Sequence, residues 1–253
     1  MTRRKLILPV LALVAIGAIL ILYFSFRTDE DYRTRFSVHY RDAITFLTDH
    51  ESTFVDGIRA GGGDPALLVP VVFPELMRYS LLRAALEGAA MKLLYIKGGK
   101  AAANLSIGRC QIKASFVEGL EQSFNAPGPA GLLGYSSTDE QAIRAERVAR
   151  LEDLSWDVRY LACFFVLVRR RFHAYLDTLE PTAQIRFLAS AYNHGFGRDP
   201  ARIVRWEHTR YFPYGFGVTA SQYNYGDIAV DFYRDCWRQR MAARRPNEPA
   251  TLP

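Results

Sequence analysis

Three short segments of the chain place a carboxylate, amides and a phenol in an order that could serve acid–base chemistry. The first is VVFPEL, in which Glu75 is the single carboxylate and follows an apolar run. Burial among apolar groups favours the protonated form of a carboxyl, which is the form that can donate a proton. Two later segments, SIGRCQI and AYNHG, supply the other candidates: Ser106, Gly108, Gln111, Tyr192 and Asn193.

The elements that must position these residues have the pattern of a mainly α-helical domain. Asp64 and Pro65 are a typical cap and first-turn pair for a helix that contains the apolar run 66–73. Helical spacing of apolar residues predicts further helices over residues 81–95, 112–124, 140–177, 182–194 and 224–242. Residues 160–168 are apolar on every side, which indicates the buried central helix of a globular domain. Strand-like alternation is almost absent.

The order of the three segments resembles that of the lytic transglycosylases of the goose-type lysozyme superfamily. That family has a catalytic glutamate at the end of an apolar helix, then Gly-x-x-Gln-[Ile/Leu/Met], then Ala-Tyr-Asn-x-Gly. The resemblance covers roughly residues 64–235 and predicts a lysozyme-like helical fold. It implies Glu75 as the acid/base, and a cleft lined by Ser106, Gly108, Gln111, Tyr192, Asn193 and a tyrosine that is either Tyr223 or Tyr225.

The resemblance also implies an activity, namely cleavage of the MurNAc–GlcNAc β-1,4 bond of peptidoglycan. Most glycosidases use two carboxylates. A lytic transglycosylase instead uses one glutamate, because the C6 hydroxyl of the substrate attacks the anomeric carbon and leaves a 1,6-anhydromuramyl end. No cofactor is expected. The alternatives are a hydrolytic lysozyme acting on the same bond and a non-catalytic peptidoglycan-binding protein of the cell envelope.

The chain departs from the family pattern around its glutamate. Leu76 stands where the family has Ser, and 36 positions separate Glu75 from Gln111, more than the family usually has. Glu51 is followed by Ser and so matches the Glu-Ser dipeptide of the family. However, it lies in a polar run and is not preceded by an apolar segment. Glu87 has the pattern of a solvated helix face. Glu75 is therefore the preferred catalytic residue.

Two prolines leave the local structure at the candidate acid open. Pro70 and Pro74 either kink one continuous helix or mark a new first turn at Glu75. A new first turn would favour the ionised carboxylate through the helix dipole.

An apolar run near the N-terminus predicts a membrane anchor. Residues 6–26 carry no charge and are long enough to span a bilayer, and Arg3, Arg4 and Lys5 precede them. Basic residues favour the cytoplasmic side, so we expect a single-pass protein of the bacterial inner membrane with its catalytic domain in the periplasm. A cleaved signal peptide is the alternative, but the run is long and ends in bulky side chains.

The expected organisation has four parts. Residues 1–27 form a cytoplasmic tip and the transmembrane anchor, residues 28–63 a helical juncture, residues 64–245 the lysozyme-like catalytic domain and residues 246–253 a loose tail.

Charge and cysteine content narrow the class of partner. The formal net charge is +6, and three of these charges belong to the residues that precede the apolar run. The remaining charge of about +3 is only a weak indication of nucleic-acid binding. A mildly basic exterior suits a glycan that carries carboxylates. The three cysteines are too few for a disulfide framework, and neither they nor the histidines have metal-ligand spacing. The expected partners are peptidoglycan strands, the membrane through residues 6–26, and other cell-envelope machinery.

Overall fold

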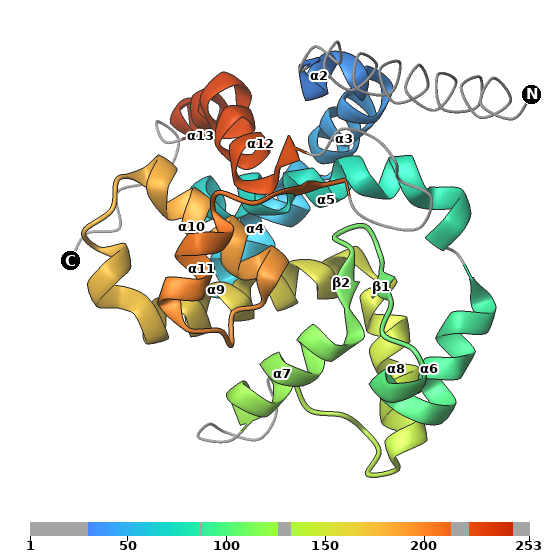
Figure 1. The fold of residues 1–253 in the computed structure, drawn as a ribbon. Coiled ribbons are helices and arrows are strands. Elements are labelled where there is room, and N and C mark those ends of the chain that lie inside the picture. The colour runs from blue at the N-terminus through green and yellow to red at the C-terminus, as the bar shows by residue number, and fades with distance from the viewer. Residues whose placement is uncertain (1–29, 87, 126–132, 214–222, 245–253) are drawn as a thin grey trace, which may run out of the picture. The chain divides into compact units, whose positions relative to one another are not determined.

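The computed structural model describes residues 30–86, 88–125, 133–213 and 223–244. These residues are mainly α-helical, which confirms the expected fold class at that level (Figure 1). The described helices include none with the length and apolar character to cross a bilayer. The predicted anchor (6–26), the predicted tail (246–253) and Glu87 lie outside the described residues.

The chain divides into two units, residues 1–37 and residues 38–253. In the first unit the described residues form α2 (Tyr32–Arg35), where the Asp31 side chain accepts a hydrogen bond from the Arg33 backbone N–H. Helix α3 (Ser37–Asp49) begins at the boundary, and all later elements belong to the second unit.

Helix α5 (Pro65–Leu86) is the central helix of the second unit and carries Glu75. Residues 67–78 are all buried, because α4 (Glu51–Ala60), α9 (Leu154–Leu176), α10 (Pro181–His194) and α12 (Tyr225–Phe232) pack around it (Figure 1). The helix continues through Pro70 and Pro74, so no new first turn forms at Glu75. The helix dipole therefore does not act on Glu75 through a helix N-terminus.

The C-terminal elements hold α5 in place from one side. After α12 the chain continues as a π-helical turn, η1 (Tyr233–Trp237), and α13 (Arg238–Arg244). The Trp237 indole N–H donates to the Pro65 carbonyl at 2.9 Å, and the Phe232 ring stacks on Phe73 with centroids 3.8 Å apart. These contacts fix the N-terminal half of α5, which is the segment that precedes Glu75.

Helix α9 contains the apolar run 160–168, and most of that run is buried as predicted, although α5 and not α9 is the central helix of the unit. The prediction of one helix over residues 140–177 is wrong, because the chain forms α8 (Glu140–Leu151) and then α9. Asp153 separates them by acting as the N-cap of α9, where its carboxylate accepts a hydrogen bond from the Ser155 backbone N–H at 2.7 Å.

A second group of helices consists of α6 (Ala89–Ala102), α7 (Ala114–Asn125) and α8 (Figure 1). Arg147 of α8 joins them through two buried bonds at 2.6 Å, one to the Glu121 carboxylate of α7 and one to the Tyr95 hydroxyl of α6. The predicted helix 81–95 is wrong, because the chain breaks between α5 and α6, where Gly88 is the N-cap of α6. Glycine is a poor residue in a helix interior, so this break has a local cause.

Two small antiparallel hairpins complete the described fold. Strand β1 (Ser106–Ile107) pairs with β2 (Ile112–Lys113), so the predicted helix 112–124 begins later, at Ala114. The remaining elements are α11 (Pro200–Trp206), β3 (Arg210–Phe212) and β4 (Tyr223–Asn224).

Candidate active site

Glu75 lies on the middle of α5 with only 1% of its surface exposed. Arg78, one helical turn later, is also buried, and its Nε donates to Glu75 Oε2 at 2.6 Å. The Nη2 of the same guanidinium donates to the Ser106 hydroxyl at 3.4 Å. A buried carboxylate needs a counter-charge, and Arg78 supplies it while linking α5 to the β1–β2 hairpin.

The turn of this hairpin depends on two residues with left-handed backbone conformation. Gly108 has φ +71° and Gln111 has φ 51°. A Cβ on Gly108 would clash with the Leu151 carbonyl oxygen, so only glycine fits there. The Gln111 amide closes the turn by donating from Nε2 to the Gly108 carbonyl at 2.8 Å. Gln111 is thus a turn residue with a buried side chain, and its Oε1 has no hydrogen-bond partner.

Cys110 fixes the tip of the hairpin to two helices. Its backbone N–H donates to Asp157 Oδ2 of α9 at 3.1 Å, and its carbonyl accepts from the Tyr192 hydroxyl of α10 at 2.8 Å. Burial raises the pKa of the Asp157 carboxyl well above its usual value, although the hydrogen bonds from Cys110 oppose this shift. Burial also raises the pKa of the Cys110 thiol, and the charge of Asp157 adds to this. The thiol is therefore an inert buried group.

The C-terminal end of α10 supplies an aromatic and an amide side chain. The Tyr192 ring meets Phe116 and Phe164 edge to face, with centroids 5.5 Å apart in each case. Asn193 Oδ1 accepts from the Trp206 indole N–H at 2.9 Å, which orients its amide. The helix ends at Gly195 with φ +116°, as an Asn-x-Gly sequence predicts.

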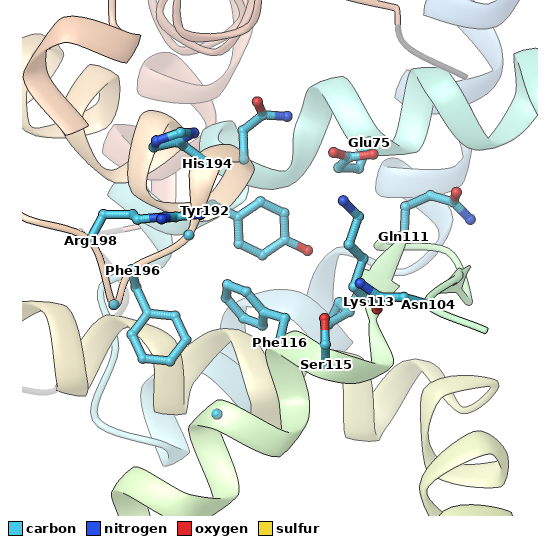
Figure 2. A pocket seen from close by; sticks show the side chains of 15 residues that line it. Glu75, Asn104, Gln111, Lys113, Ser115, Phe116, Tyr192, His194, Phe196 and Arg198 are labelled. Atoms are coloured by element: carbon cyan, nitrogen blue, oxygen red, sulfur yellow. The ribbon is translucent and has the colours of Figure 1, made fainter. Parts of the chain in front are cut away.

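A cavity of about 360 Å³ lies where these elements meet (Figure 2). Glu75, Gln111, Tyr192 and Asn193 all line it, so the three segments of the sequence converge on one site. Tyr192 and Gln111 lie on opposite sides of Glu75 in Figure 2. Of the described residues that line the cavity, only Glu75 carries a carboxylate. The site can therefore offer one acid/base group beside amides and an aromatic surface.

Three of the predicted site residues lie elsewhere. Ser106 and Gly108 line a neighbouring cavity of about 440 Å³, which shares Gln111 with the first. Tyr225 does not line the Glu75 cavity either: its hydroxyl donates to the Val71 carbonyl of α5 at 3.0 Å. Ser106 and Tyr225 thus contact the elements around the acid rather than the cavity itself.

The alternative glutamate Glu51 has a different environment. Its carboxylate forms ion pairs with Arg240 at 3.2 Å and with Arg244 at 2.8 Å, which tie α4 to α13. It does not line the Glu75 cavity. This geometry indicates a structural role for Glu51.

Several residues of the cavity were not predicted from the sequence: Asn104, Lys113, Ser115, Phe116, Phe196 and Arg198. Lys113 could have been found by strand alternation only if the two-residue strand β2 had been recognised. Arg198 belongs to the loop after α10, and no local pattern indicates where such a loop folds.

His194 stacks on Trp206 with ring centroids 4.2 Å apart. Burial, and then the charges of Arg198 and Arg202, lower its pKa below the usual value, so the ring is neutral at pH 7.

Among the residues that the structure describes, no cluster of His, Cys, Asp or Glu could hold a metal ion.

Comparison with known proteins yields no relative: no family model matches the chain, and neither the curated proteins nor the solved structures contain a match. Function is therefore inferred from the residues of the cavity.

Proposed function

We propose that this protein is a peptidoglycan lytic transglycosylase that cleaves the MurNAc–GlcNAc β-1,4 bond with Glu75 as its acid and base. The observation that carries the proposal is the convergence of Glu75, Gln111, Tyr192 and Asn193 on one cavity. These residues come from segments 36 to 118 positions apart in the sequence, in the order in which lytic transglycosylases have their catalytic glutamate, Gly-x-x-Gln and Ala-Tyr-Asn segments.

The chemistry suits a site with one carboxylate. The Glu75 carboxyl donates its proton to the glycosidic oxygen as the bond from the anomeric carbon to that oxygen breaks. The substrate's C6 hydroxyl oxygen then bonds to the anomeric carbon, and its proton passes to the Glu75 carboxylate. No water is consumed, and the product ends in 1,6-anhydromuramic acid. A second carboxylate, which the usual hydrolytic mechanisms require, is absent from the described lining of the cavity.

Arg78 must change partner during this cycle. A carboxylate that is ion-paired with a guanidinium carries no proton to donate, so the acid step requires that Glu75 first take up a proton and that its bond to Arg78 weaken. The guanidinium already contacts Ser106, which gives it a second partner when the charge on Glu75 is neutralised. Ser106 thus acts on the acid through Arg78.

The location of the protein is part of the proposal. Residues 6–26 anchor it in the bacterial inner membrane, and the lysozyme-like domain lies on the periplasmic side, where its substrate is. The absence of charge from the run and the basic residues before it support this topology.

Two observations favour a second candidate, a non-catalytic peptidoglycan-binding protein. The buried ion pair between Glu75 and Arg78, at 2.6 Å, is also compatible with a purely structural role for Glu75. In addition, Leu76 replaces the Ser of the family and is itself buried. A protein of this kind would bind the glycan in the same cavity without cleaving it.

Product analysis separates the candidates. Purified peptidoglycan strands are incubated with the full chain in detergent, and the released fragments are weighed by mass spectrometry. The proposal predicts anhydro ends, which are lighter by one water than the reducing ends that a hydrolytic lysozyme leaves. Reducing ends would contradict the transglycosylase reaction, and bound glycan without release would favour the non-catalytic candidate.

A further inference from the structure

Two cations line the Glu75 cavity, and the part of the chain that the structure describes gives neither of them an acidic partner. Lys113 is the last residue of β2 and Arg198 lies in the loop after α10, and both are exposed. Among the described residues neither side chain takes part in an ion pair. By contrast, Lys92 pairs with Glu152 at 2.6 Å and Lys100 pairs with Glu118 at 3.1 Å. Unlike these lysines, the cations of the cavity are available for a ligand.

The charge balance of the cavity is positive. The carboxylate of Glu75 is compensated by Arg78, so within the described lining Lys113 and Arg198 add positive charge that no acidic side chain balances. His194 responds to this charge, because Arg198 and Arg202 contribute, after burial, to the lowering of its pKa. A cavity of this kind attracts anions.

The two cations lie at different ends of an aromatic surface. Figure 2 shows Lys113 extending from β2 toward Glu75, whereas Arg198 lies on the other side of the Tyr192 ring. Phe116, whose ring meets Phe196 edge to face with centroids 5.0 Å apart, lines the cavity between them. A ligand that fits this arrangement has apolar ring faces and anionic groups at more than one place along its length.

We infer that Lys113 and Arg198 form a binding site for carboxylates of the glycan, and this inference rests on the proposed function for the identity of the polymer. The Arg198 guanidinium can hold a carboxylate with two parallel hydrogen bonds, and Lys113 supplies a point charge beside Glu75. Peptidoglycan offers carboxylates from two sources: the lactyl group of a muramyl residue without a peptide, and the stem peptide where one is attached. Both sources have the same chemistry at this site.

The test measures binding rather than cleavage. The full chain with Glu75→Gln is titrated in detergent with three ligands: peptide-free glycan fragments, peptide-bearing fragments, and peptide-free fragments whose carboxylates are converted to methyl amides. We expect the methyl amides to bind about tenfold more weakly than the peptide-free fragments, because a charge-assisted bond is lost. The peptide-bearing fragments identify the source, since they bind tightly only if the site accepts stem-peptide carboxylates.

Single-charge variants assign the effect to the two cations. In the same background, Lys113→Gln and Arg198→Gln should each reduce the preference for the carboxylate form, whereas Arg170→Gln should keep it. Arg170 is the matched control, because it is an exposed cation on α9 that does not line the cavity. Circular dichroism melting curves check that each variant is folded.

The other outcomes overturn the inference in distinguishable ways. If the carboxylate and methyl amide forms bind equally well, the carboxylate site is wrong and the proposed glycan substrate stands. If Arg170→Gln weakens binding as much as the other two variants, the effect is general charge attraction and not a site. If no glycan form binds, the proposed function fails together with this inference.

Discussion

Glu75 and Asp157, the two most buried carboxyls near the hairpin, are held in different ways. Glu75 has a guanidinium as its partner, at 2.6 Å. Asp157 receives the Cys110 backbone N–H on Oδ2, while its Oδ1 is buried with no hydrogen-bond partner. The unsatisfied Oδ1 of Asp157 destabilises the fold, whereas the hydrogen bond on Oδ2 fixes the hairpin to α9. Glu75 is therefore suited to chemistry, and Asp157 is suited to positioning the β1–β2 hairpin.

The raised pKa of Asp157 predicts a stability that depends on pH. Because burial raises this pKa above 3.8, the folded protein holds the proton more tightly than the unfolded chain does. The contribution of Asp157 to folding is therefore fully present below pH 3.8 and falls as pH rises from there through the folded pKa. Asp157→Asn keeps an acceptor for the Cys110 N–H and removes the charge. Urea unfolding from pH 4 upward should give a free energy that rises relative to wild type as pH increases; a constant difference would contradict the assignment.

The sequence predicted those site residues that carry a recognisable local signal. Glu75 follows an apolar run, and Gln111, Tyr192 and Asn193 belong to short segments with a known order. Lys113 and Arg198 could not be predicted, because their places in the cavity depend on how a hairpin and a loop fold against other elements. The pairing of Arg78 with Glu75 does have a sequence signal, namely the i,i+3 spacing on one helix.

Among the elements, the β1–β2 hairpin has the largest role in assembling the site. It carries Gln111 and Lys113 into the Glu75 cavity and Ser106 toward Arg78. It is held by α9 through Asp157 and by α10 through Tyr192. Any displacement of the hairpin should therefore move Gln111 and Lys113 in the cavity and disturb the contacts of the hairpin with α9 and α10.

Gly108→Ala tests this role of the hairpin. The new Cβ would meet the Leu151 carbonyl oxygen and lie 2.9 Å from Asp157 Oδ2, at a backbone φ of +71°. We expect a loss of about 1–3 kcal/mol in the free energy of unfolding, as overpacking of a rigid site gives, together with reduced glycan cleavage. Gly197→Ala is the control, because its Cβ would have no neighbour within 4 Å although Gly197 lines the Glu75 cavity. Equal stability of the two variants in urea unfolding would refute the role of Gly108.

The boundaries of the helices show where element prediction fails. Apolar spacing correctly predicted helical character over most of the described chain. It missed the breaks at Gly88 and Asp153, because one glycine or one capping carboxylate ends a helix without changing the apolar pattern around it. It also missed β1 and β2, since strands of two residues are too short to show alternation.

For the whole molecule, the proposed anchor predicts a defined topology. A reporter that is active only in the periplasm, fused after residue 245, should give a signal, because the proposed topology places the basic residues Arg3, Arg4 and Lys5 on the cytoplasmic side. The paired fusion to a reporter that is active only in the cytoplasm should be silent. The opposite pattern would refute the topology and would place the domain away from peptidoglycan.

The most direct measurement compares glycan release by the full-length wild type, Glu75→Gln and Glu51→Gln. Glu51 provides a matched control, because it is a glutamate of the same domain whose carboxylate is held in ion pairs with Arg240 and Arg244 outside the cavity. We predict that Glu75→Gln abolishes release of anhydro fragments while the protein stays folded and still binds glycan, and that Glu51→Gln cleaves at close to the wild-type rate. Undiminished cleavage by a folded Glu75→Gln protein would contradict the assignment of Glu75 as the acid.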